Sequence, residues 1–256
     1  MFVAGSSGIQ NNGTLYTDAN GLHMMKRSFN KEEAVAMNFF PLPSAAFLEN
    51  EQFRLSLLTA QPTAVAPLAP GHFEFMVDRQ LQNDDGKGLS PGDADTSLPS
   101  RLNYRILLEP RQTGALGKSL FHSSLSFHSL QDLLYPATVV TRPLTATTPP
   151  VSWPRVVGGL LPCDVELVSF RFLSDKTALA LLRRLPFDGD VSSPVPSDCS
   201  GSVDSYWHLL NAFAPDGVFY LSNLTGTQRN ERVDQRAFAS LFDDAFLIRA
   251  IRIELP

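Results

Sequence analysis

The chain has little cysteine, no long hydrophobic run and no basic stripe, and each absence excludes something. Its two cysteines, Cys163 and Cys199, are too few to define a disulfide framework. The longest apolar stretch, residues 165–172, is interrupted by Glu166 and is far shorter than the ~20 residues that span a bilayer. The net charge is −5 and no Lys/Arg stripe is present to meet phosphates, which argues against a nucleic-acid partner.

The N-terminal residues do not resemble a targeting segment. Residues 1–13 lack a basic start followed by an apolar core, so we expect no signal peptide here and expect the chain to begin within a fold. Two sequons, Asn12-Gly13-Thr14 and Asn223-Leu224-Thr225, permit N-glycosylation if the chain enters the secretory pathway. Chance produces a sequon or two in a chain of this length, so the use of either one stays open.

Helical periodicity is scarce, and short alternating runs are common. The runs FRLSLLT (53–59), HFEFMVD (72–78) and LNYRILLE (102–109) each place apolar residues at every second position. A period of two with one apolar face is typical of half-buried antiparallel strands. With turn residues between the runs, the pattern predicts an all-β fold, an antiparallel β-sandwich with a second, smaller β-part and little helix.

The middle of the chain differs from both ends. Residues 111–135 are rich in Ser, Leu and His and predict a short helix near 129–134, and residues 136–162 contain six prolines, which favour an extended connection. A second set of strand patterns follows, in DVELVSFRFL, TALALLRRL, GVFYLSNLT and FLIRAIRIEL. We therefore expect a first sandwich part at 1–110, a Ser/Pro-rich connecting segment at 111–162 and a C-terminal β-part at 163–256.

Sites for metal or nucleophilic chemistry are weakly supported. His122 and His128 lie six residues apart, a spacing that gives no shared face on a helix or strand, so two partly buried loop histidines are expected rather than a metal pair. No Gly-x-Ser-x-Gly motif occurs, and Cys163 precedes an apolar strand, where a buried thiol is expected.

One charged segment stands out, VDRQLQNDDGKGL at 77–89, which follows a strand pattern. Asp78, Asp84 and Asp85 have the chemistry that glycoside hydrolysis takes from paired carboxylates. Adjacent aspartates before a glycine are also typical of a solvated turn, and composition alone favours the turn.

Four ordered blocks resemble a known family: TDANGLHMMKR (17–27), FFPLPSAAFLENEQFRLSLLTAQP (39–62), GHFEFMVDRQLQNDDGKGL (71–89) and LNYRILLE (102–109). They are similar to the C-terminal β-region of class II α-mannosidases, glycoside hydrolase family 38. The later runs LPCDVELVSFRF and TALALLRRLPFD resemble the Golgi branch of that family. The resemblance implies a galactose mutarotase-like supersandwich.

The resemblance also implies a division of roles. Family members are zinc-dependent, retaining exo-α-mannosidases whose catalytic carboxylates and zinc ligands lie in an N-terminal domain, so this chain alone is expected to be inactive and to hold no metal. Arg79 matches a basic residue that approaches the substrate pocket, and Asp78, Asp84 and Asp85 are expected to hold the loop around it. An ion pair with Asp78 or Asp84 is the equally weighted alternative for Arg79.

Three departures from the family pattern are visible: Gln80 stands where many relatives have a second Arg, Lys87 replaces an Arg, and Gly189 stands where a Cys can pair with the residue matching Cys199.

The expected partners follow from the same resemblance. They are an upstream catalytic domain of the same polypeptide and a mannose-containing glycan, in the Golgi lumen, with membrane attachment only through a preceding anchor. A sandwich edge built to pack on that domain is expected to expose an apolar patch.

The alternative is a stand-alone carbohydrate-binding or scaffold sandwich. Its stacking candidates are Trp153, Tyr206 and Trp207. Trp153 lies among prolines, and the Tyr206-Trp207-His208 run leads into an apolar segment that predicts burial.

Overall fold

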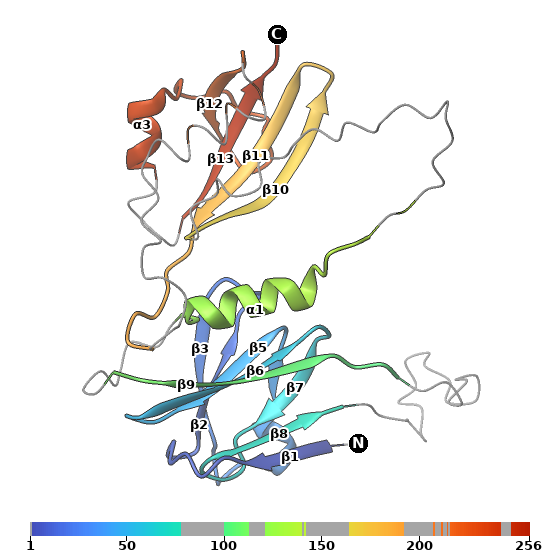
Figure 1. The fold of residues 1–256 in the computed structure, drawn as a ribbon, viewed down its shortest axis with the longest axis vertical. Coiled ribbons are helices and arrows are strands. Elements are labelled where there is room, and N and C mark those ends of the chain that lie inside the picture. The colour runs from blue at the N-terminus through green and yellow to red at the C-terminus, as the bar shows by residue number, and fades with distance from the viewer. Residues whose placement is uncertain are drawn as a thin grey trace. The chain divides into compact units, whose positions relative to one another are not determined.

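The computed structural model describes residues 2–77, 100–112, 121–139, 141, 164–191, 207, 211, 214, 216–241 and 247–256. The chain divides into two compact units, drawn in Figure 1. Unit 1 comprises Met1–Val139 and Asp188–Val195, and unit 2 comprises Val140–Phe187 and Pro196–Pro256. Most of the expected connecting segment lies outside the described residues, so the three-part boundaries stay a prediction.

Unit 1 contains two antiparallel sheets. The first has the order β1 (Phe2–Ser6), β8 (His72–Met76), β7 (Thr63–Ala66) and β4 (Phe40–Leu42). The second has the order β3 (Met24–Ser28), β2 (Thr14–Asp18), β5 (Ala45–Glu49), β6 (Phe53–Thr59) and β9 (Tyr104–Pro110). A short 3₁₀ helix, η1 (Val35–Asn38), precedes β4.

The core of unit 1 combines side chains from both sheets. Leu15, Leu48 and Leu57 of the second sheet share one buried cluster with Val65 and Phe73 of the first. Alternation puts these residues on the facing sides of the strands, where burial removes them from water. The predicted all-β sandwich fold is confirmed.

A helix covers the outer face of the second sheet. Helix α1 (Ser124–Leu134) begins five residues before the predicted helix, because the hydroxyl of Ser123 caps it by accepting a hydrogen bond from the backbone N–H of Ser126. Leu130 packs against Ala45 and Leu58 of the sheet. His128 therefore lies in a helix, and the expectation of a loop histidine was wrong.

This cover changes how two predicted strands are buried. Arg54 and Ser56 of β6 lie on the face opposite Phe53, Leu55 and Leu57, yet both are buried. In β9, the residue that packs beside the helix is Leu107, whereas Ile106 and Leu108 are exposed. Simple alternation places the residues on the correct faces but does not reveal what covers each face.

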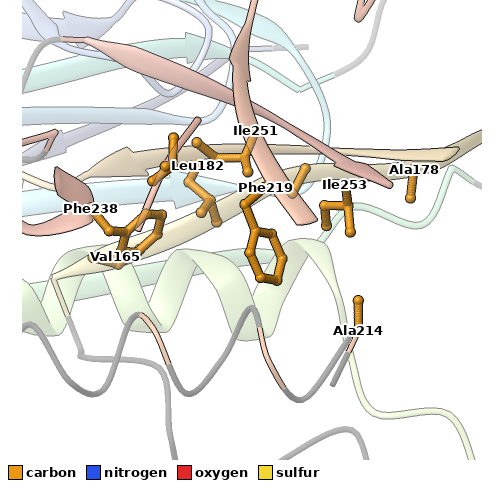
Figure 2. Packing of buried hydrophobic residues seen from close by; sticks show 10 residues of the cluster. Val165, Ala178, Leu182, Ala214, Phe219, Phe238, Ile251 and Ile253 are labelled. Carbon is orange, nitrogen blue, oxygen red and sulfur yellow. The ribbon is translucent and has the colours of Figure 1, made fainter. Parts of the chain in front are cut away.

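In the described part of unit 2, four strands form one antiparallel sheet with helical cover. Its order is β10 (Val165–Ser174), β11 (Thr177–Arg184), β13 (Ile248–Glu254) and β12 (Val218–Ser222), and α3 (Gln235–Ser240) follows β12 in the chain. Figure 2 shows its core, in which Phe238 and Ile251 are fully buried with Leu182 and Phe219. Among the described residues, no helix is long and apolar enough to cross a membrane.

Candidate functional site

The predicted substrate-facing residues cannot be placed. Arg79, Asp78, Asp84 and Asp85 lie outside the described residues, so their roles stay predictions. The strand before them is described through Val77, and Phe73 and Phe75 of β8 anchor it in the core.

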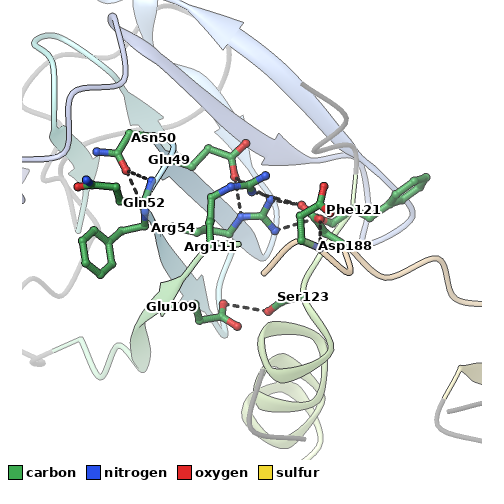
Figure 3. Close-up of polar contacts among 11 residues, drawn as sticks. Glu49, Asn50, Gln52, Arg54, Glu109, Arg111, Phe121, Ser123 and Asp188 are labelled. Atoms are coloured by element: carbon green, nitrogen blue, oxygen red, sulfur yellow. Dashed lines mark hydrogen bonds and ion pairs between the residues drawn. The ribbon is translucent and has the colours of Figure 1, made fainter. Parts of the chain in front are cut away.

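A buried ion network occupies the outer face of the second sheet (Figure 3). Arg54 donates from Nε to Oε2 of Glu49 at 2.8 Å and pairs through Nη2 with Oδ2 of Asp188. Arg111 Nη1 lies 2.5 Å from the same Glu49 oxygen and 3.5 Å from the Asp188 oxygen. Two guanidinium groups thus face two carboxylates, and the four charges balance.

The strand register explains why these groups meet. Glu49 on β5 is directly opposite Arg54 on β6, which is opposite Glu109 on β9, so all three side chains share one face. The guanidinium of Arg54 also lies 4.0 Å over the ring of Phe47, and that ring stacks on Tyr16 at 4.7 Å between centroids. Because Arg54 is 0% exposed, its role is to hold the fold and not to contact a ligand.

Glu109 is a buried carboxyl beside this network. Its Oε2 accepts a hydrogen bond from Ser123 Oγ at 2.9 Å, whereas Oε1 has no hydrogen-bond partner in the described part of the chain. Burial raises the pKa of Glu109 above its ordinary value of 4.5, and the nearby Asp188 also raises it, against the lowering effects of Ser123 and Arg54. A raised carboxyl pKa suits a general acid, but Glu109 is only 1% exposed, so a substrate cannot reach it.

A polar hollow of about 550 Å³ opens next to the network. It is lined by Gln10, Asn11, Asn12, Thr14, Tyr16, Lys26, Glu49, Asn50, Glu51 and Gln52. Burial raises the pKa of the Tyr16 hydroxyl, and Glu49 adds to the effect, so this group stays a neutral hydrogen-bond donor and acceptor. The lining can hydrogen-bond a polyhydroxylated ligand, but Glu49 is already bound by two arginines and is not available as a base.

The TDANG block forms a second buried cluster of hydrogen bonds, centred on Asp18. Asp18 accepts hydrogen bonds from the backbone N–H groups of Gly21, Ser44 and Ala45 at 2.8–3.0 Å, and from Ser44 Oγ at 2.8 Å. Asn20 and Gly21 have positive φ angles of 55° and 71°, which asparagine and glycine tolerate best. This family block therefore fastens the β2–β3 turn to the start of β5.

The other candidates from the sequence also have structural roles where they are described. His122 Nδ1 lies 3.3 Å from Ser126 Oγ at the start of α1, and no cluster of three or more metal-ligating side chains occurs among the described residues. Trp207 makes edge contacts with Phe219 and Phe238 at 5.2 and 6.1 Å between centroids, so it belongs to the unit 2 core and is not a free stacking platform. Trp153 and Tyr206 lie outside the described residues, as do Cys163 and Cys199.

Sequence reasoning missed the ion network. Arg54 and Glu49 were visible as charges at strand ends, but Asp188 joins them from 134 residues further along the chain. The available signal was the arginine at the second position of a strand whose other residues are apolar or uncharged. Such an arginine needs a charged partner if it is buried.

Comparison with known proteins places the chain. Residues 1–87 match the sequence model of the glycosyl hydrolases family 38 C-terminal domain. Alpha-mannosidase 2x of Mus musculus is 32% identical over 196 residues, covering 70% of this chain and 17% of that protein. Alpha-mannosidase 2 of Homo sapiens is 31% identical over 200 residues, covering 73% and 17%.

A shorter match of higher identity involves Alpha-mannosidase 2 of Drosophila melanogaster, which is 41% identical over 101 residues, or 40% of this chain and 9% of that protein. The chain thus covers less than a fifth of the length of these relatives. Taken with the sandwich fold of unit 1, the matches show that the chain belongs to the C-terminal region of glycoside hydrolase family 38.

Proposed function

We propose that the chain is the C-terminal part of an α-mannosidase that removes terminal α-mannosyl residues during N-glycan processing, and that it supports the active site of an N-terminal catalytic domain. The observation that carries the proposal is the 31% identity to human Alpha-mannosidase 2 over 200 residues. A retaining, zinc-dependent reaction and a Golgi location belong to the same proposal, because they follow from the family and not from this chain.

The described residues do not fit a zinc site. The buried His122 lies beside a serine hydroxyl, and the buried carboxylates Glu49 and Asp188 are bound by arginines. An arginine-bound carboxylate is a poor metal ligand, because its lone pairs are already used. The proposal therefore assigns the metal and the nucleophile to the catalytic domain and derives no chemical step here.

An apolar strip supports the role as a packing partner. Phe53, Ile106 and Leu108 point to the same side of the second sheet as its core residues, but they are 41%, 68% and 62% exposed. Large aliphatic side chains at neighbouring positions of an edge strand are unusual on a free surface. We assign this strip to contact with polypeptide that precedes residue 1.

Arg79 is the residue of this chain that the proposal places nearest to substrate. It comes three residues after the end of β8 in the sequence, and a guanidinium can donate several hydrogen bonds to sugar hydroxyls. The buried β8 strand would supply the rigid support that a substrate-positioning side chain needs.

A chimera tests the proposal. Residues 1–256 replace the matching region of human Alpha-mannosidase 2, and hydrolysis of an aryl α-mannoside is measured beside the isolated chain. We expect turnover by the chimera and none by the isolated chain. Arg79→Ala should lower kcat/KM by about 10- to 100-fold, the cost of a charged hydrogen bond, whereas Arg101→Ala, at an exposed arginine, should leave it unchanged. A folded but inactive chimera, or turnover by the isolated chain, would contradict the proposal.

A further inference from the structure

The two sequons lie in opposite structural settings. We infer that Asn12 carries an N-linked glycan in the folded protein and that Asn223 does not. The inference rests on the proposed passage through the secretory pathway, and it concerns a modification that the α-mannosidase assignment does not by itself supply.

Asn12 lies at the tip of a tight turn. The N–H of Thr14 donates to the carbonyl of Asn11 at 3.0 Å, and the two residues between them, Asn12 and Gly13, have φ angles of 52° and 66°. Positive φ at both central positions is typical of a type I′ turn, and this turn leads directly into β2. Asn12 is exposed, and its side chain makes no hydrogen bond to other described residues.

The residues beside Asn12 hold the turn without it. Asn11 is buried, and its Oδ1 accepts a hydrogen bond from the N–H of Gly71 at 2.8 Å. Thr14 donates its hydroxyl to the carbonyl of Asn11 at 2.7 Å. Asn12 itself borders the polar hollow, whose lining offers amide, hydroxyl and ammonium groups that can hydrogen-bond a first sugar. A glycan at this position displaces nothing that the fold uses.

Asn223 has the opposite setting, because its amide group organises the loop after β12. Its Oδ1 accepts hydrogen bonds from the N–H groups of Thr227 and Gln228 at 2.9 and 3.2 Å, and its Nδ2 donates to Thr227 Oγ1 at 2.8 Å. Both ends of the amide are used, and the atom that would bear the sugar is in contact with Thr227.

The backbone of the same loop also packs closely against the sheet of unit 2. Gly226 closes a turn by donating to the carbonyl of Asn223 at 2.9 Å and has a φ of 77°. A Cβ at Gly226 would lie 2.6 Å from Leu173 Cδ1, so the loop sits tightly on the sheet. Sugar transfer occurs on the entering chain before folding, so the fold decides which modified chains mature. A glycan at Asn12 is compatible with this fold, and one at Asn223 opposes it.

Glycan mapping tests the inference. The full chain is secreted from eukaryotic cells behind an added signal peptide. Its N-glycans are removed with N-glycosidase F in ¹⁸O-labelled water, and the peptides are analysed by mass spectrometry. If secretion fails, the same peptides are mapped in the chain retained in the cells. We expect ¹⁸O-aspartate at Asn12 in most molecules and unmodified Asn223. On a denaturing gel, N-glycosidase F should no longer change the mobility of the Asn12→Asp variant, whereas it should still change the mobility of the Asn223→Asp variant. An unmodified Asn12, or an occupied Asn223 in folded secreted protein, overturns the inference.

A stability comparison gives an independent measurement. In unglycosylated protein from bacteria, Asn223→Asp should lower Tm by several degrees because the donor to Thr227 is lost, whereas Asn12→Asp should leave Tm unchanged. Equal effects at both sites would overturn the structural distinction. The added signal peptide imposes the secretory route, so the two experiments are independent. An unmodified Asn12 would not contradict the function tested by the chimera, and an inactive chimera would not contradict the glycan map.

Discussion

Replacing Arg54 with methionine should destabilise unit 1 more than any surface substitution. Arg54→Met keeps most of the side-chain volume but removes the charge that pairs with both Glu49 and Asp188. Arg111 would then face two carboxylates alone, which leaves one negative charge uncompensated in a buried site. The bond to the Phe121 carbonyl and the contact with the Phe47 ring are lost as well.

The size of the effect follows from the burial of the network. The side chains of Arg54, Glu49 and Asp188 are 0%, 4% and 7% exposed, so solvent screens the remaining charge poorly. Removing one partner of a buried ion pair costs about 3–5 kcal/mol. For a unit of this size the loss corresponds to a fall in Tm of roughly 6–20 °C.

The matched control is Arg105→Met. Arg105 lies on the same face of the sheet but pairs with Asp132 at 3.7 Å in solvent, with side chains 40% and 79% exposed. Such a pair contributes about 0–1 kcal/mol. The double variant Arg54→Met with Glu49→Gln should lose less stability than the sum of the losses in the two single variants. In the double variant, one positive charge (Arg111) again faces one negative charge (Asp188).

Urea unfolding of the full chain, combined with hydrogen exchange of the β5, β6 and β9 peptides, measures the effect where it occurs. Exchange should accelerate in these peptides and stay unchanged in β10 to β13 of unit 2. If Arg54→Met is as stable as Arg105→Met, the four charges do not form a stabilising network and the structural role given to Arg54 is wrong.

Four further predictions concern single sites. Asp18→Ala should lower the free energy of unfolding in urea by about 2–4 kcal/mol, because it leaves the buried donors of the turn without their acceptor. A loss below about 1 kcal/mol would contradict the role given to the Asp18 hydrogen bonds. Glu109→Gln should stabilise the protein more at about pH 7.5 than at about pH 4, because a raised carboxyl pKa means that the wild type loses stability as pH rises through the folded pKa. An effect independent of pH would show that Glu109 titrates normally. Gly71→Ala should cost more than Gly8→Ala, although both have positive φ, since a Cβ at Gly71 would lie 2.8 Å from a backbone carbonyl and one at Gly8 would meet nothing within 4 Å; calorimetry of the two variants decides it. Phe238→Ala should cost about 3–5 kcal/mol and accelerate exchange in unit 2, because the fully buried ring leaves a cavity.

Much of the sheet structure could be predicted because strand residues signal locally. HFEFMVD became β8, since apolar residues at every second position need a core on one side, and the short continuous apolar run in TALALLRRL became the largely buried strand β11. The cover on the outer face could not be predicted in the same way. Helix α1 is short, and its start is set by the serine cap at Ser123, which the pattern of apolar residues does not mark.

The ion network lay beyond sequence reasoning for a different reason. A charged residue in a strand pattern is normally assigned to solvent, and nothing local distinguishes the buried Arg54 from the half-exposed Arg105. The difference comes from Asp188, which reaches unit 1 from the far side of a long intervening segment. Long-range pairing of this kind is fixed by topology, and a single sequence carries no direct record of it.

The burial of these residues also limits what the family blocks can say about chemistry. Asp18 of TDANG and Arg54 of the RLSLL strand are buried charges of the first two blocks. Asp18 accepts hydrogen bonds inside the fold, and Arg54 forms ion pairs there. Their presence in a sequence is required by the turn at Gly21 and the pairing of β5 with β6, whether or not the protein hydrolyses mannosides. The blocks at 17–62 therefore identify the sandwich, and any claim about substrate must rest on the segment after β8, which contains Arg79.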